Sequence, residues 1–131
     1  MIFFKFKLTD RRKEFHNEKY SYVYEYDGDF SIFIGKELFF DEPGMPILEF
    51  FRDVNKWRKI WDKSKNMFYN CVETEDNPLI SFININNDWV IHSPWQKFKC
   101  NVTFTRKEIE NALIILENNV NEQLAKFDSV V

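Results

Sequence analysis

Histidines, serines, cysteines and glycine-rich loops carry much of enzyme chemistry, and this chain of 131 residues shows none of them in a catalytic arrangement. His16 and His92 are not flanked by the cysteines or carboxylates of a metal cluster. None of the six serines lies in a nucleophile elbow, and three glycines are too few for a phosphate-binding loop. We therefore expect a non-catalytic protein with no metal and no cofactor.

The carboxylates gather in short groups at predicted turns and loops. These groups are Asp27 and Asp29, Asp41 and Glu42, and Glu73, Glu75 and Asp76. Solvation and turn chemistry explain carboxylates at such places better than general acid–base catalysis does. Cys71 and Cys100 follow no metal or redox spacing, which favours a reducing compartment.

The length and composition predict one packed domain that spans residues 1–131. Hydrophobic residues make up 44% of the chain, and only 3 Gly and 4 Pro leave little room for linkers. The formal charge of −3 gives no overall field toward nucleic acid or an acidic membrane. Lys5 and Lys7 interrupt the apolar N-terminus, so we expect no signal peptide, no membrane span and a cytoplasmic location.

The stretch 80–104 predicts three consecutive antiparallel strands. Two apolar runs flank Asn86, Asn87 and Asp88, which tolerate the positive φ of a tight turn at Asn86-Asn87 or at Asn87-Asp88. Either turn places the same residues on one face, namely Ile80, Phe82, Trp89 and Ile91. After Ser93-Pro94-Trp95 ends the pairing, strict alternation predicts a third strand with an inner face of Phe98, Cys100, Val102 and Phe104.

The N-terminal half predicts further strands. The first alternates from Ile2 to Leu8. Asp27-Gly28, a strong hairpin signal, joins a strand at 20–26 to one at 30–34, and Gly35-Lys36 turns the chain into 37–40. Pro43-Gly44 and Pro46 then break the sheet pattern, and a short strand is expected within 67–72.

Two amphipathic helices complete the pattern. In the helix expected at 46–63, one side carries Ile47, Phe50, Phe51, Val54, Trp57 and Trp61, and the opposite stripe carries Arg52, Lys56, Lys59 and Lys63. Because both tryptophans lie opposite the basic stripe, we expect them in the core, which argues against base stacking and nucleic-acid binding. The second helix begins with a Thr105–Glu108 capping box and continues as an apolar stripe to Phe127.

The order of these elements predicts an α+β fold. We expect an antiparallel β-sheet of about six to seven strands, in the order ββββ-α-βββ(β)-α, with both helices packed on one face.

Four tyrosines spaced two residues apart, Tyr20, Tyr22, Tyr24 and Tyr26, project from one face of their predicted strand. A two-residue Asp27-Gly28 turn sets Tyr22 beside Phe33 on the open face, where the row of tyrosines would bind a partner or a second copy. A three-residue loop with Gly28 in a bulge moves the tyrosines into the core. The sequence leaves both registers open.

The segment from Asn77 to Phe98, NPLISFININNDWVIHSPWQKF, is followed by a capped amphipathic helix. It resembles small uncharacterised bacterial proteins of AT-rich Gram-positive genomes, and many proteins of this layout are similar to the immunity proteins encoded beside polymorphic toxins. The resemblance covers the last half of the chain and rests on Asp88-Trp89 and Ser93-Pro94-Trp95. It implies an immunity-type role by analogy.

We therefore expect a cytoplasmic protein-interaction module, with an immunity-type inhibitor of a toxin as its specific form, because an inhibitor needs a complementary surface and no chemistry. The candidate protein-binding residues are Tyr20, Tyr22, Tyr24, Tyr26, Phe33, Asp27, Asp29, Glu73, Glu75 and Asp76. The alternative is a small-ligand-binding protein or enzyme with an aromatic-lined pocket between the sheet and the helices. A dimer or a subunit of a larger assembly is a third alternative.

Overall fold

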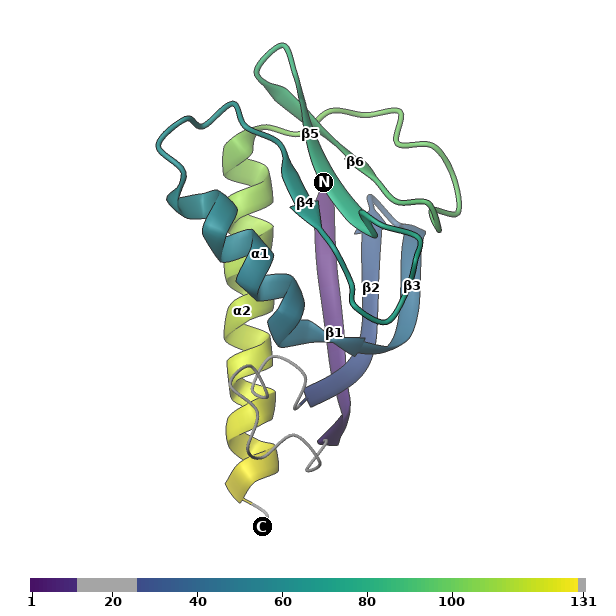
Figure 1. The fold of residues 1–131 in the computed structure, drawn as a ribbon, viewed down its shortest axis with the longest axis vertical. Coiled ribbons are helices and arrows are strands. Elements are labelled where there is room, and N and C mark those ends of the chain that lie inside the picture. Colours follow the sequence, from purple (N-terminus) through teal and green to yellow (C-terminus); the bar gives the residue numbers. More distant parts are fainter. Residues whose placement is uncertain (12–25, 130–131) are drawn as a thin grey trace.

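The alternating N-terminal residues form the first strand of an antiparallel sheet, termed sheet A (Figure 1). The structure is a computed structural model that describes residues 1–11 and 26–129. Sheet A has the order β1-β2-β3 and consists of β1 (Ile2–Arg11), β2 (Tyr26–Ile34) and β3 (Glu37–Pro46). Ile2, Phe4 and Phe6 are buried and the residues between them are exposed, which confirms the predicted inner face of β1.

Asp27 and Gly28 do not form a hairpin turn, so the strand pair predicted around them is wrong. Both residues lie inside β2, where Gly28 pairs with residues of both neighbouring strands. A Cβ at Gly28 would lie 2.3 Å from the carbonyl oxygen of Lys7 and 2.4 Å from Cζ of Phe6. Glycine is required here because the neighbouring strand approaches closely, and no turn is involved.

β3 continues past the residues at which we expected the sheet pattern to break. Pro43 and Pro46 are tolerated because β3 is an edge strand of sheet A, with no further strand of the described residues on its outer side. Between the partners of Phe30 and Gly28, β3 contains one residue more than β2, and Gly44 at this point has a φ of +71°. The proline-glycine pair therefore makes a bulge within the strand.

A second antiparallel sheet, termed sheet B, has the order β4-β5-β6 and consists of β4 (Met67–Tyr69), β5 (Ile80–Ile85) and β6 (Asp88–His92). Of the two turns that the sequence left open, the structure has Asn86-Asn87, with φ of +53° and +73°. The residues expected on one face are all buried, namely Ile80, Phe82, Trp89 and Ile91. The described strands thus form two three-stranded sheets in place of the single predicted sheet.

Residues 98–104 do not form the predicted third strand. Phe104 pairs with Trp89 in an isolated bridge, but Val102 of the expected inner face is exposed. The N–H of Lys97 donates to the carbonyl oxygen of Phe39 in β3, and the rings of Phe39 and Phe98 pack edge to face. The start of the segment therefore contacts β3 of sheet A. Only Phe104, near its end, pairs with β6, so no regular strand pairing with β6 forms.

α1 (Ile47–Lys59) packs against both sheets. The predicted apolar side is buried over the length of the helix, at Ile47, Phe50, Phe51, Val54 and Trp57. The ring of Phe50 lies 5.2 Å from that of Phe30 in sheet A and 5.4 Å from that of Tyr69 in sheet B. Phe50 thereby joins the sheets in one shared core.

α2 (Arg106–Ser129) runs beside β1, at the edge of sheet A (Figure 1). The predicted capping box is confirmed, because the Thr105 hydroxyl accepts from the N–H of Glu108 at 3.1 Å and the Glu108 carboxylate accepts from the N–H of Thr105 at 3.2 Å. The side-chain amide of Gln123 accepts from the N–H of Leu8 and donates to the carbonyl oxygen of Phe6, both at 2.7 Å. α2 therefore covers the β1 edge of sheet A. The sequence had predicted that both helices would pack on one face of the sheet.

Candidate functional site

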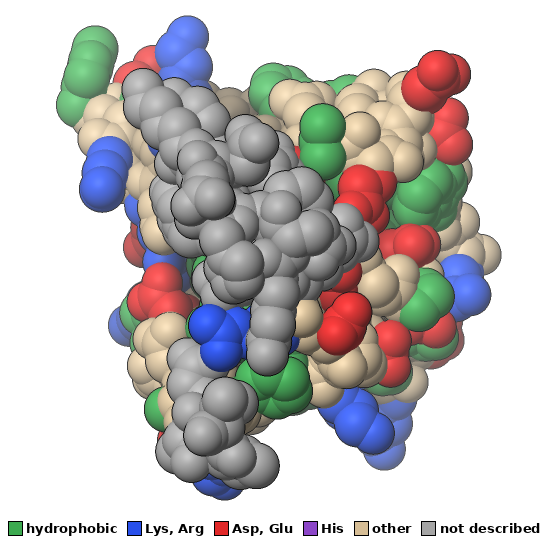
Figure 2. Space-filling view, turned by 60° about the horizontal axis from the view of Figure 1, so that its bottom comes forward, with side chains coloured by type: hydrophobic (Ala, Val, Ile, Leu, Met, Phe, Trp, Pro, Cys, Tyr) green, Lys and Arg blue, Asp and Glu red, His purple; other side chains and the backbone are tan. Residues whose placement is uncertain are grey.

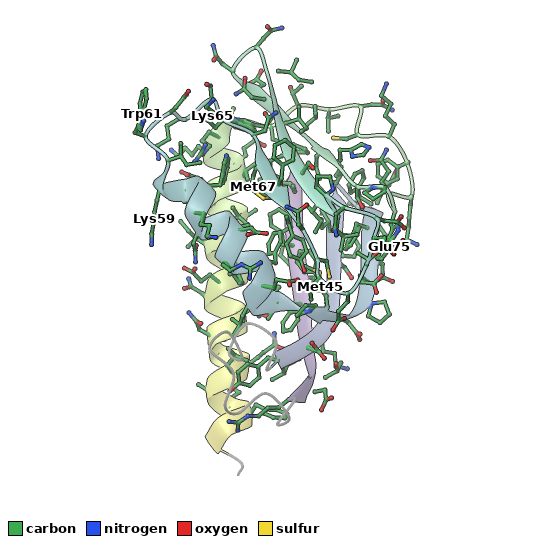
Figure 3. All side chains as sticks on the ribbon, viewed as in Figure 1. Met45, Lys59, Trp61, Lys65, Met67 and Glu75 are labelled. Atoms are coloured by element: carbon green, nitrogen blue, oxygen red, sulfur yellow. The ribbon has the colours of Figure 1, made fainter. Side chains whose placement is uncertain are left out.

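Acidic residues of β3 and of the loop between β4 and β5 meet on one side of the molecule. Glu42 of β3 is partly buried and close enough to Asp41 and Glu73 for their charges to act on it. The acidic surface is defined here as Asp41, Glu42, Glu73, Glu75 and Asp76, of which all but Glu42 are exposed. Acidic side chains lie close together on the right of Figure 2, the side on which Figure 3 labels Glu75.

The environment of Glu42 within the acidic surface disfavours the ionised form of this side chain. Burial raises the pKa of Glu42, and the nearby charges of Asp41 and Glu73 raise it further. A positive group placed beside these carboxylates would relieve the repulsion between them. The acidic surface is therefore a region of negative charge on which nearby carboxylates repel one another.

A cavity of about 110 Å³ lies within the acidic surface. Its lining combines two of the carboxylates with less polar residues and includes Glu42, Met45, Pro46, Cys71, Glu73 and Trp95. The indole N–H of Trp95 donates to a carboxylate oxygen of Asp76 at 2.8 Å, which fixes one wall. The cavity is smaller than the roughly 300–1,000 Å³ of sites that enclose a small molecule, and it suits a single side chain of a partner.

Asn77 holds the shape of the β4–β5 loop that carries three of these acids. Its side-chain oxygen accepts from the N–H of Cys71 at 2.8 Å, and its amide nitrogen donates to the carbonyl oxygens of Cys71 and Thr74 at 2.9 and 2.8 Å. Three hydrogen bonds from one side chain thus order the loop within the fold itself. Such ordering lowers the entropy cost of binding.

Glu49 of α1, a fully buried carboxylate, anchors the start of the same loop. It accepts a hydrogen bond from the hydroxyl of Tyr69 at 2.7 Å and one from the N–H of Val72 at 3.4 Å. Burial raises the pKa of Tyr69 and of the neighbouring Cys71 thiol, so neither supplies an anionic nucleophile near neutral pH. Sequence reasoning missed Glu49, although an acidic residue inside the apolar run 47–51 is the signal that could have found it.

The remaining acidic candidates lie elsewhere. Asp27 is buried within β2 and is not a turn residue. Asp29 is exposed on the open face of sheet A and lines a shallow groove of about 340 Å³ together with Lys5 and Lys7. Phe33 lines the same groove. The structure therefore places Glu73, Glu75 and Asp76 together on one exposed loop, whereas Asp27 is buried within β2.

The tyrosine row falls largely outside the structure. Tyr20, Tyr22 and Tyr24 lie outside the described residues. Tyr26 is buried, and the guanidinium carbon of Arg11 lies 5.7 Å from the centroid of its ring. Because Asp27-Gly28 makes no turn, neither of the two hairpin registers considered for this row occurs.

Trp61 is not in the core, so its predicted burial is wrong. α1 ends at Lys59, and the extended backbone of Ile60 leads the chain out of the helix. Trp61 is therefore 89% exposed, whereas Trp57 is buried as predicted. The prediction extended the helical period to Trp61, which would place its side chain on the buried side. Because the helix ends two residues earlier, that period does not apply to Trp61.

Within residues 1–11 and 26–129, no group of three or more His, Cys, Asp or Glu is placed to hold a metal ion. His92 is exposed at the end of β6, and His16 lies outside the described residues. Neither α1 nor α2 has a stretch long and apolar enough to cross a membrane.

Comparison with known proteins identifies a family. No curated protein and no solved structure matches the chain. A family described as a domain of unknown function (DUF7878) matches residues 4–126, a range that includes both sheets except the first two residues of β1, and most of α2. The chain therefore belongs to the DUF7878 family.

Proposed function

We propose that the protein is a non-catalytic protein-interaction module whose acidic surface binds a basic protein domain. The observation that supports this most strongly is the meeting of carboxylates from two distant segments around one small cavity. A basic partner would offset the repulsion within this group, and the complementary charges would guide its approach. The bonds from Asn77 and to Glu49 supply the rigidity that such a surface needs.

Inhibition of a basic toxin domain in the cytoplasm is the specific form of this proposal. The resemblance of residues 77–98 to immunity-like proteins supports it by analogy. Cys71 and Cys100 are free thiols, which agrees with a reducing compartment.

The partner to test is the basic product of a gene adjacent to the one that encodes this chain. Glu73→Lys with Glu75→Lys should slow association about tenfold at low salt and weaken its dependence on ionic strength, because steering would be lost. The dissociation rate should change less, because these exposed charges act mainly during approach. Stopped-flow measurements at several salt concentrations give both rate constants.

Glu37→Lys with Glu122→Lys is the matched control. It changes the net charge by the same amount at two exposed residues outside the acidic surface. Equal slowing by both double variants would show that net charge alone steers the partner, and the proposed site would be wrong. If no basic product of an adjacent gene binds, the inhibitor role is wrong.

A further inference from the structure

The residues after α1 form a basic loop with an aromatic side chain at its tip. Trp61 is 89% exposed and the neighbouring Ile60 is 38% exposed. Figure 3 shows Trp61 and Lys59 at one side of the molecule and Glu75 of the acidic surface at the opposite side. A large aromatic side chain held in water is unfavourable by itself, and tryptophan is enriched where proteins bind.

The loop has a defined shape. The carboxylate of Asp62 accepts from the backbone N–H of Ser64 at 3.0 Å and from its hydroxyl at 2.6 Å. The ammonium group of Lys63 donates to the carbonyl oxygen of Arg58, in the last turn of α1, at 2.8 Å. Binding at Trp61 would therefore need little further ordering of the backbone.

The side chains of Trp57 in α1 and Arg106 in α2 bind the backbone of this loop. The indole N–H of Trp57 donates to the carbonyl oxygen of Lys65 at 2.7 Å. Arg106, at the start of α2, lies 3.5 Å from the centroid of the Trp57 ring and donates to the carbonyl oxygen of Lys63 at 3.2 Å. The backbone of the loop is thus bound to the protein, while the side chains of Lys63 and Lys65 are exposed.

Positive charge surrounds Trp61. Residues 52–65 contain six Lys and Arg and two Asp, a local charge of +4 in a chain whose net charge is −3. Lys56 and Lys59 are exposed and lie about 4.5 Å apart along the axis of α1. No carboxylate of the described residues forms an ion pair with either lysine. A row of cations therefore runs along α1 toward the exposed indole.

A single-stranded nucleic acid fits this combination. An indole stacks on any base, and a row of lysines neutralises successive phosphates. Lysine is depleted at protein–protein interfaces, where tryptophan is accompanied by tyrosine and arginine. Stable attachment to a lipid surface needs a wider apolar face than Ile60 and Trp61 provide.

We propose that Trp61, Lys56, Lys59, Lys63 and Lys65 bind single-stranded nucleic acid. The indole stacks on one base, and the ammonium groups contact the phosphates on either side. The expectation of no nucleic-acid binding rested on the net charge and on the burial of Trp57 and Trp61, and the structure contradicts it for Trp61. The proposed site is separate from the acidic surface and does not depend on its function.

Fluorescence anisotropy of a labelled oligothymidine of about 12 nucleotides tests the proposal, because one binding module covers on the order of 4–16 nucleotides. At low salt we expect a micromolar dissociation constant that rises as salt is added. Trp61→Ala should weaken binding about tenfold, and Trp61→Phe should restore most of it because a phenyl ring still stacks. Lys56→Glu with Lys59→Glu should abolish binding.

Lys36→Glu with Lys97→Glu is the matched control, since both residues are exposed, lie outside the loop and give the same change in net charge. It should retain most of the affinity, and Trp61→Ala should keep the melting temperature of the unchanged protein. The proposal is overturned by the absence of binding, by equal losses in the two lysine pairs, or by unchanged affinity in Trp61→Ala. Binding to phosphatidylglycerol vesicles but not to the oligonucleotide would overturn it in favour of a lipid surface.

Discussion

Gly28 and Gly35 are both in turn-like sequences, yet different constraints select glycine at the two positions. Gly35 has a φ of +62° and open space where a Cβ would be, so its backbone conformation favours glycine. Gly28 has no room for a Cβ beside the backbone of β1. The same residue type thus marks a turn in one case and close strand packing in the other.

Gly28→Ala should therefore destabilise the fold by about 3 kcal/mol or more, at or above the top of the range for overpacking, because the new atom would overlap a backbone oxygen. Gly35→Ala is the comparison and should cost about 1–2 kcal/mol through its left-handed backbone alone. Urea denaturation measures both free energies of unfolding. A smaller loss for Gly28→Ala than for Gly35→Ala would contradict the close approach of β1.

Glu42 and Asp62 should respond to pH with opposite signs. Burial and the charges of Asp41 and Glu73 raise the pKa of Glu42, so its ionisation reduces stability as the pH rises through the folded-state pKa. Hydrogen bonds from Ser64 lower the pKa of Asp62, so its contribution is present at neutral pH and is lost as the pH falls through the folded-state pKa.

Glu42→Gln should accordingly raise the melting temperature more near pH 7 than in acid, because the stability lost through the ionisation of Glu42 increases as the pH rises. Asp62→Asn should lower the melting temperature near pH 7, and this loss should shrink as the medium becomes acidic. Thermal unfolding followed by circular dichroism across this range gives both profiles. Profiles of the same sign would refute the assigned causes.

At the scale of elements, α2 stabilises sheet A in two ways. Its apolar stripe enters the shared core, and Gln123 occupies the free edge of β1. An edge strand with unpaired N–H and C=O groups is open to pairing with other chains. One amide side chain satisfies a donor and an acceptor of β1 at once.

Gln123→Ala should cost about 1–3 kcal/mol, because it leaves two partly buried backbone groups without their partner. Gln123→Glu should cost at least as much, since a carboxylate still accepts from Leu8 but repels the carbonyl oxygen of Phe6. Equilibrium unfolding in urea compares the two. If Gln123→Glu were as stable as the unchanged protein, donation to Phe6 would contribute nothing.

Leu116 and Ile115 are adjacent in α2 but face opposite environments, at 1% and 56% exposure. Leu116→Ala should cost about 2–5 kcal/mol by leaving a cavity in the core. Ile115→Ala should stay within about 0.5 kcal/mol. The same denaturation experiment measures both, and similar losses would mean that the helix is rotated from the described orientation.

At the scale of the whole molecule, both sheets and both helices contribute to one core. Phe82 of sheet B shows this, because its ring lies 6.1 Å from that of Phe4 in sheet A and 5.5 Å from that of Trp57 in α1. Neither three-stranded sheet has a core of its own. Folding is therefore expected to be a single cooperative transition.

A chain truncated from Glu108 onward should not fold, because it loses the apolar stripe of α2 and the cover of the β1 edge. Thermal unfolding followed by near-ultraviolet circular dichroism detects the loss of fixed aromatic packing. A truncated chain that kept a cooperative transition would contradict the single core.

Features that depend on neighbouring residues were predictable from the sequence. The alternation of β1, the Asn86-Asn87 turn, the buried face of β5 and β6, the apolar side of α1 and the Thr105–Glu108 capping box are all confirmed. Each is fixed by side-chain period or by hydrogen bonds within a few residues, so a local pattern is enough to determine it.

Features that depend on contacts between distant segments were decided only by the tertiary structure. The Asp27-Gly28 pair satisfies a hairpin rule, but β1 packs against it. Residues 98–104 alternate like a strand, but Phe39 of β3 binds their start. Trp61 continues the helical period of α1, but the helix ends before it. The meeting of Glu42 with Glu73 has the same origin, because no local pattern records which loop will lie beside which strand.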